Sequence, residues 1–254
     1  MAEELTEPGG SIRLYVETPL STGVRVDVDE GQAHYLVNVM RARPGDRVRL
    51  FNGRDGEWLA RVAEVTKRGC ALECEAQTAP YRAVPDLWLV FAPIKKTPAD
   101  YVVQKATELG VRVLQPVLTR RTIARRVNLE RMRANGVEAA EQSGRVDAPE
   151  VRDLVELERL LAAWPGERKL LFCDEAGEAP SIAEALRALP RGQQPREPWA
   201  VLTGPEGGFD PAERALVREQ PFTVPAALGE RILRADTAAL AALAVWQSIL
   251  GDWG

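Results

Sequence analysis

The feature of this sequence that most constrains its fold is an alternation of short apolar runs with helical patterns, which begins at Leu87. The run at 87–92 is continuously apolar, as is typical of a strand covered on both faces. Helical segments begin with capping residues, for example Asp210-Pro211-Ala212-Glu213. Such alternation predicts an α/β domain with a mainly parallel sheet. The expected strands lie at 87–92, 111–117, 169–173, 199–203 and 222–224, and the expected helices at 97–109, 129–142, 181–189, 211–218 and 236–250.

Residues before about 80 show a different pattern. Short β-rich runs are separated by turn sequences such as Pro44-Gly45-Asp46 and Asn52-Gly53, which are hairpin signals. Several short strands at this spacing predict a small β-barrel, with one amphipathic helix at 30–40. A linker with two prolines follows at 78–86. The sequence therefore predicts two domains, a barrel over residues 1–80 and an α/β domain over residues 81–254.

Composition excludes several classes of protein. The chain has 254 residues, of which 45% are apolar, so it can bury a substantial core. No apolar stretch approaches the ~18 residues that a membrane helix needs, and no secretory signal is visible. Three cysteines (Cys70, Cys74 and Cys173) favour buried free thiols in a reducing cytosol over a disulfide framework. With His34 as its single histidine, the chain offers no zinc set, and we expect no metal.

Two segments near the C-terminus each follow an expected strand and lead into a helix. They are Thr203-Gly204-Pro205-Glu206-Gly207-Gly208-Phe209 and residues 228–238. Ligands of parallel sheets bind beyond the carboxyl ends of strands, and glycine lets the main chain approach a ligand closely. Neither segment carries a P-loop or dinucleotide fingerprint, which disfavours triphosphate and NAD enzymes. The pattern predicts one small-molecule site with Arg231, Arg234 and Asp236 as charged groups; the alternative is a tight turn and a helix start that Asp236 caps.

The net charge of −4 conceals a basic stretch. Lysine and arginine outnumber aspartate and glutamate between 95 and 145, and the densest part is the arginine-rich segment at 119–126. One interpretation is a solvated helix end. The other is a phosphate-contact surface for RNA, because the planar guanidinium suits phosphate. The candidate RNA-binding residues are Arg120, Arg121, Arg125 and Arg126.

These motifs together resemble the RsmE family, the bacterial 16S ribosomal RNA (uracil-N3)-methyltransferases of the SPOUT superfamily. The resemblance spans nearly the whole chain, with the motifs in the expected order. Its most specific segments are 33–36, 51–53, 104–110, 138–145, 203–209 and 228–238.

The resemblance implies a SPOUT-type α/β methyltransferase domain whose C-terminal part forms a deep trefoil knot. It also implies a PUA-like barrel that binds RNA, a cytoplasmic homodimer, and S-adenosylmethionine as cofactor. The substrate would be 16S ribosomal RNA of the small subunit, methylated at N3 of a uridine. Two rivals remain, a SPOUT enzyme that methylates the ribose 2′-hydroxyl and a non-catalytic RNA-binding assembly factor.

The family's functional residues transfer to this sequence position by position. Arg231 or Arg234 would stabilise negative charge on the uracil, and Asp236 or Glu206 would accept its proton. Asp236 stands where the family more often has glutamate, which shortens the carboxylate's reach by one methylene. His34 lies in the barrel domain, and we do not expect it to be catalytic. The cofactor-binding residues would come from the strand end at 172–175 and the two loops, namely Phe172, Asp174, Thr203, Gly204, Pro205, Glu206, Gly207, Gly208, Leu228, Gly229, Arg231, Ile232 and Leu233.

Overall fold

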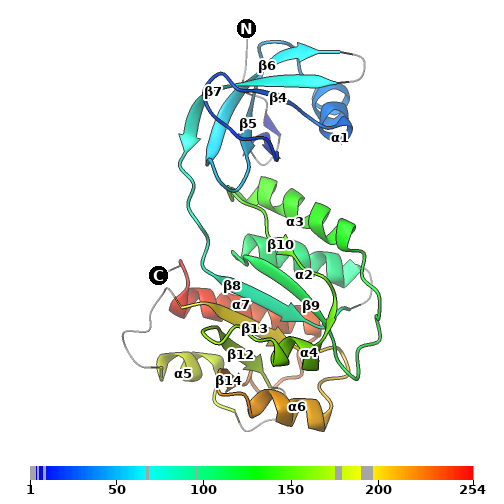
Figure 1. Cartoon of the computed structure of the whole chain (residues 1–254), viewed down its shortest axis with the longest axis vertical. Coiled ribbons are helices and arrows are strands. Elements are labelled where there is room, and N and C mark those ends of the chain that lie inside the picture. Colours follow the sequence, from blue (N-terminus) through cyan, green and yellow to red (C-terminus); the bar gives the residue numbers. More distant parts are fainter. Residues whose placement is uncertain are drawn as a thin grey trace. The chain divides into compact units, whose positions relative to one another are not determined.

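The computed structural model divides into two units. It describes residues 4, 6–7, 10–66, 69–94, 97–174, 179–189 and 197–253. The first unit contains Met1–Ala83 and Val137–Ala148, and the second contains Val84–Gly136 and Pro149–Gly254 (Figure 1). The sequence-based domains, 1–80 and 81–254, remain a prediction, and no sequence pattern indicated that Val137–Ala148 packs with the first unit.

The first unit is built on a five-stranded sheet in the order β3-β5-β6-β7-β4. All neighbours are antiparallel except β3 and β5. Alternate residues such as Val48, Leu50 and Val62 are buried, as the pleat of a half-covered strand requires. The expected strands and helix are confirmed. The elements are β1 Thr6–Glu7, β2 Gly10–Ser11, β3 Arg13–Tyr15, β4 Arg25–Asp27, α1 Glu30–His34, the π-helical turn η1 Tyr35–Val39, β5 Arg47–Phe51, β6 Glu57–Val65, β7 Cys70–Ala79 and the end of α3 Leu129–Ser143.

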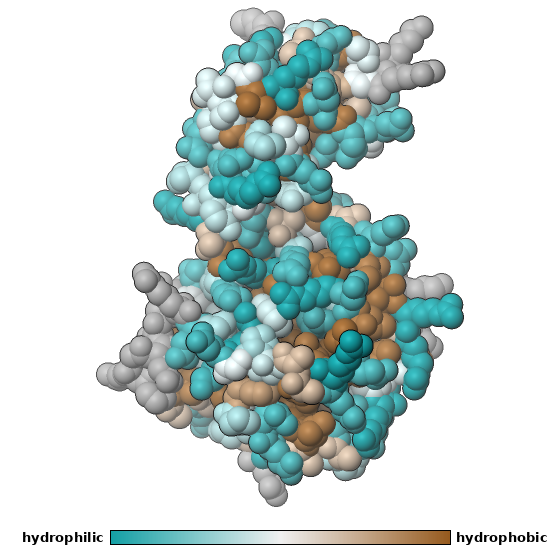
Figure 2. Space-filling view, in the orientation of Figure 1, coloured by the Kyte–Doolittle hydropathy of each residue, from teal (hydrophilic) through white to brown (hydrophobic). Residues whose placement is uncertain are grey.

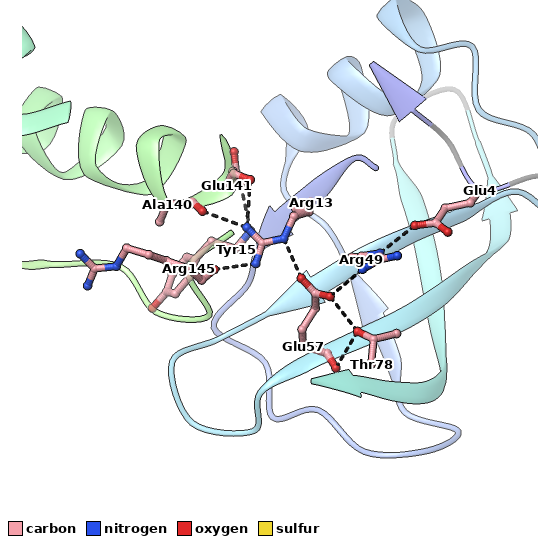
Figure 3. A network of polar contacts seen from close by, with 9 residues as sticks. All are labelled: Glu4, Arg13, Tyr15, Arg49, Glu57, Thr78, Ala140, Glu141 and Arg145. Atoms are coloured by element: carbon pink, nitrogen blue, oxygen red, sulfur yellow. Dashed lines mark hydrogen bonds and ion pairs between the residues drawn. The ribbon is translucent and has the colours of Figure 1, made fainter. Parts of the chain in front are cut away.

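Arg13 makes most of the hydrogen bonds that hold the end of α3 in the first unit (Figure 3). The Arg13 guanidinium donates to the main-chain oxygens of Ala140 and Glu141 at 2.9 Å and of Arg145 at 2.6 Å. Its Nε also pairs with Glu57 Oε2 at 2.6 Å. The last carbonyls of a helix lack intrahelical partners, so Arg13 supplies the donors that the end of α3 needs.

The second unit has a parallel sheet in the order β10-β9-β8-β13-β12-β14, with β11 paired to β9. The expected α/β architecture is confirmed. Its strands are β8 Leu87–Phe91, β9 Val113–Leu118, β10 Glu150–Val151, β11 Val155–Glu156, β12 Lys169–Cys173, β13 Trp199–Thr203 and β14 Thr223–Ala226. Besides the first half of α3, its helices are α2 Thr97–Glu108, α4 Leu157–Ala162, α5 Ile182–Arg187, α6 Pro211–Arg218 and α7 Ala235–Leu250.

Apolar residues cover both faces of this sheet, as the continuous run in β8 predicts. Leu87 and Leu89 belong to the core cluster shared with α2, α5 and α7. Trp88 and Val90 point the other way, into the cluster with residues of α4 and α6. The alternation follows from the two-residue repeat of a strand. The sheet is therefore a buried platform, and only its ends are available for a site.

The structure also bears on the expectations for the cysteines and for membrane helices. The three cysteines are free and buried, as expected. No helix among the described residues is long and apolar enough to cross a membrane. The trefoil knot remains a prediction.

Candidate functional site

A cavity of about 540 Å³ lies where β12, β13 and β14 end. Its walls come from the end of β12 and from two loops, the first loop (204–210, between β13 and α6) and the second loop (227–234, between β14 and α7). The sequence predicted a site on these segments. The lining residues are Cys173, Asp174, Thr203, Gly204, Pro205, Glu206, Phe209, Ala227, Leu228, Gly229, Glu230, Arg231, Ile232, Leu233, Arg234, Ala235 and Ala238.

The first loop owes its shape to glycine at position 204. A Cβ built on Gly204 would lie 2.7 Å from a ring carbon of Phe209, which is too close for two carbon atoms. Phe209 in turn packs edge-on against the ring of Phe172, with centroids 5.1 Å apart. Gly208 turns the chain with φ of 65°, and its N–H donates to the carbonyl of Pro205. The main chain therefore folds tightly over an aromatic base and lies against the cavity.

The second loop presents charged and apolar side chains to solvent. Gly229 has φ of 94°, a conformation that favours glycine. Arg231 and Arg234 are exposed, and Ile232 is fully exposed at 101%. Both arginines line the cavity, so positive charge stands beside it.

A buried carboxylate fixes one side of the cavity. Asp174, at the end of β12, is only 2% exposed and pairs with Arg214 at 2.7 Å and Arg218 at 2.5 Å, both on α6. These pairs hold α6, and with it the end of the first loop, against the strand end. Beside it, burial raises the pKa of the Cys173 thiol to about 12, so that thiol is protonated and unreactive at neutral pH.

The predicted cofactor-binding and catalytic residues fall into two groups. Most line the cavity. Four do not: Phe172 supports the first loop from the core, Gly207 and Gly208 lie within that loop, and Asp236 lies at the start of α7. Glu175, also in the predicted strand-end segment, lies outside the described residues.

The alternative role of Asp236 as the cap of α7 is wrong. Arg234 occupies the N-cap position and makes no side-chain cap. Asp236 is the second residue of α7, and its Oδ1 accepts from the N–H of Thr237 at 2.8 Å. Three further lining residues, Cys173, Phe209 and Glu230, belong to the predicted segments although no individual role was predicted for them, whereas Ala227 lies outside those segments.

The four arginines predicted to contact RNA have different surroundings. Arg120 is paired with Glu158 at 3.0 Å and Asp210 at 3.1 Å. Arg121 donates to the carbonyl of Gly207 at 3.0 Å. Arg125 and Arg126 are exposed and pair with no carboxylate among the residues that the structure describes. They are the two guanidinium groups of this set that are most available to a phosphate.

Comparison with known proteins shows the family to which the chain belongs. The sequence model of the RNA methyltransferase domain family matches residues 82–247, and that of the RNA methyltransferase PUA domain matches residues 28–73. The ribosomal RNA small subunit methyltransferase E of Rickettsia conorii is 30% identical over 91% of this chain and 93% of its own length. The chain belongs to this methyltransferase E family. The resemblance found in the sequence is thereby confirmed, together with its SPOUT-type α/β fold and N-terminal PUA domain.

Two solved structures of similar proteins include a bound cofactor. The methyltransferase E of Neisseria gonorrhoeae, bound to S-adenosyl methionine, superposes with a TM-score of 0.83 and 30% identity, over 96% of this chain and 99% of that one. A protein of Legionella pneumophila in complex with the bound cofactor SAM superposes with a TM-score of 0.83 and 28% identity, over 95% and 98% of the two chains.

Proposed function

We propose that this protein uses S-adenosylmethionine to methylate N3 of a uridine in the 16S ribosomal RNA of the small subunit. The observation that carries the proposal is the cavity at the ends of β12, β13 and β14 in a chain whose family members share its fold throughout. Relatives at 28–30% identity have been solved with this cofactor. The protein would act in the cytoplasm, where assembling subunits are found.

The cavity fits such a cofactor in size and chemistry. Its volume of about 540 Å³ lies in the range of roughly 300–1,000 Å³ typical of small-molecule sites. Apolar side chains such as Leu228 and Leu233 offer a wall for the adenine, and the glycine-containing main chain of both loops offers donors and acceptors. Thr203–Glu206 and Leu228–Leu233 would hold the cofactor. When bound, it supplies an activated methyl group on a good leaving group.

The residues of this chain would prepare the uracil by removing its N3 proton. The Arg231 and Arg234 guanidinium groups line the cavity and would stabilise the negative charge that develops on the uracil oxygens. Of the two candidate bases, Glu206 lines the cavity and Asp236 does not. We therefore assign the proton to Glu206. Most of the rate enhancement would come from holding the two reactants in line.

The test is single-turnover methylation of small subunits from a strain lacking this enzyme, with identification of the modified nucleoside. We expect 3-methyluridine. Arg234→Ala should slow the step by about 10²–10³, the usual effect of removing one charge-stabilising donor. The Glu206→Gln variant should methylate slowly, and its rate should no longer depend on pH. Glu219 is an exposed carboxylate at the end of α6, so the Glu219→Gln variant serves as the control.

Each alternative has its own result. A 2′-O-methylated product would assign the enzyme to the ribose-modifying class. No binding of S-adenosylmethionine would indicate an assembly factor. A slow Asp236→Asn variant beside a wild-type Glu206→Gln variant would move the base to Asp236.

The arginine-rich segment is the proposed RNA contact. Arg125 and Arg126 support it because they are exposed and unpaired among the described residues. Replacing Arg120, Arg121, Arg125 and Arg126 with alanine should weaken subunit binding and flatten its dependence on salt, since each lost phosphate contact lowers the salt slope by about 0.7–0.9. An unchanged slope would exclude this surface.

The proposed homodimer is supported by large apolar side chains at the surface. Figure 2 shows apolar areas between hydrophilic ones on one face of the molecule. In the second unit, Ile232 is fully exposed and Tyr101 is 46% exposed. Side chains of this kind often mark surfaces that a partner covers. Light scattering of the purified chain should give twice the monomer mass, and a monomer at micromolar concentration would contradict the dimer.

A further inference from the structure

Arg121 belongs to the arginine-rich segment and contacts the first loop. Its NH1 donates to the main-chain oxygen of Gly207 at 3.0 Å. A Cβ built on Gly207 would lie 3.6 Å from the Cβ of Arg121, so the gap between the two segments at this point is no wider than one methyl group. The proposed RNA-contact segment therefore packs directly on a loop of the proposed cofactor site.

A buried carboxylate ties the same two segments together. Glu213 is 2% exposed. Its Oε1 accepts from the main-chain N–H of Arg120 at 2.7 Å, and its Oε2 accepts from that of Asp210 at 3.3 Å. The Arg120 side chain also pairs with Asp210. Because one rigid group holds both main chains, displacement of either segment is resisted by the other.

The Arg121 side chain has donors to spare. A guanidinium carries five N–H donors in a fixed plane, and among the described residues only the carbonyl of Gly207 accepts from one of them. The side chain is exposed, so the remaining donors can reach a phosphate. A single arginine can thus hold RNA and the first loop at the same time, and the planar fork restrains both partners together.

We infer that Arg121 is a positioning residue that couples RNA binding to cofactor binding. This inference rests on the proposed function. A phosphate held by Arg121 fixes its guanidinium, which fixes the Gly207 carbonyl and so favours the loop conformation that lines the cavity. By linkage, cofactor binding favours RNA binding by the same factor. Arg125, in the same segment, makes no hydrogen bond to the first loop within the part of the chain that the structure describes, and it lacks this role.

The test measures affinity for labelled S-adenosylhomocysteine, which binds without turnover, by equilibrium dialysis of the full chain. Measurements are made with and without saturating unmodified small subunits. For the wild type we expect subunits to raise the affinity at least about fivefold, the lower end of ordinary coupling between sites. In Arg121→Ala the ratio should fall below about twofold. Arg125→Ala should bind subunits more weakly yet keep the wild-type ratio at saturation. Unchanged melting temperatures would verify that both variants are folded.

The inference would be overturned if subunits raised the affinity of Arg121→Ala for S-adenosylhomocysteine as much as they raise that of the wild type. It would also be overturned if subunits raised the affinity of the wild type less than about twofold. In either case, methylation by the wild type would leave the proposed function standing. A wild-type protein that neither binds S-adenosylhomocysteine nor methylates subunits would overturn both. A ratio lost equally in Arg121→Ala and Arg125→Ala would show that general phosphate binding, rather than the bond to Gly207, carries the coupling.

Discussion

Replacing Arg13 with methionine should destabilise the first unit by about 3–5 kcal/mol, the usual cost of removing one partner of a buried ion pair. The Arg13 and Glu57 side chains are only 10% and 8% exposed. Without Arg13, Glu57 keeps its bonds to Arg49 at 3.1 Å and Thr78 at 2.8 Å but loses its shortest partner. The main-chain oxygens at the end of α3 lose their donor as well.

Because Glu57 keeps these two partners, we expect the free energy of unfolding to fall by an amount near the lower limit of this range, about 3 kcal/mol. A hydrogen bond to a charged group contributes about 1.5–3 kcal/mol, so a sum over the four bonds of Arg13 would exceed the range seen for whole buried pairs. Such bonds act as a network and do not add. With an m-value of about 2 kcal/mol per M, the urea midpoint should fall by about 1.5 M.

Hydrogen exchange in urea, read by mass spectrometry, resolves the first unit from the second. Peptides from β6 and from 137–148 should lose protection together in Arg13→Met. Arg13→Met/Glu57→Leu should recover part of the loss, because no buried charge is then left without its partner. Arg25→Ala, which breaks the exposed pair with Glu64, is the matched control and should change little. Protection in Arg13→Met equal to that of Arg25→Ala would refute the reasoning.

The pH dependence of this difference has a defined sign. Burial raises the pKa of Glu57, but hydrogen bonds from Arg13 and Thr78 outweigh the effect of burial and leave the pKa below the ordinary value of a glutamate. A carboxyl group whose pKa is lowered by folding stabilises the folded state at pH values above the pKa of the unfolded chain. This contribution is lost as the pH falls through the pKa of the folded state. The gap between wild type and Arg13→Met should therefore be constant near neutral pH and shrink below about pH 4.5.

Two further predictions concern the cavity. Gly204→Ala should weaken S-adenosylhomocysteine binding at least about tenfold, about 1.4 kcal/mol, because Phe209 must move away from the new Cβ. The control in the same titration is Gly166→Ala, whose new Cβ meets no atom within 4 Å, and equal affinities of the two variants would contradict this account of the loop. Cys173 should react slowly with a thiol reagent at pH 8, since burial raises its pKa to about 12; rapid labelling of the native protein would contradict its burial.

The sequence predicted those elements whose pattern has a single physical explanation. The apolar run at 87–92 predicted β8 because only a strand covered on both faces is apolar at successive positions. Asp210 and Glu213 predicted the start of α6, and both sides of the capping box are present. The two-residue strands β10 and β11 were missed because so short a pairing leaves no periodicity. The packing of Val137–Ala148 with the first unit was missed because it depends on residues far away in sequence, chiefly Arg13.

The arginine-rich segment shows why a charge cluster alone could not define a site. In the sequence Arg120, Arg121 and Arg125 are equivalent, because each adds one positive charge to the same stretch. In the structure they differ in what they already bind. Arg120 is engaged by two carboxylates, Arg121 by a main-chain oxygen of the first loop, and Arg125 by no carboxylate among the described residues. At Arg120 a phosphate must displace the two carboxylates. At Arg121 it can bind beside the carbonyl of Gly207, and at Arg125 it competes with no carboxylate of the described residues. We therefore expect Arg125 to contribute only affinity for RNA and Arg121 to contribute both affinity and communication with the cavity, a difference that the coupling experiment tests.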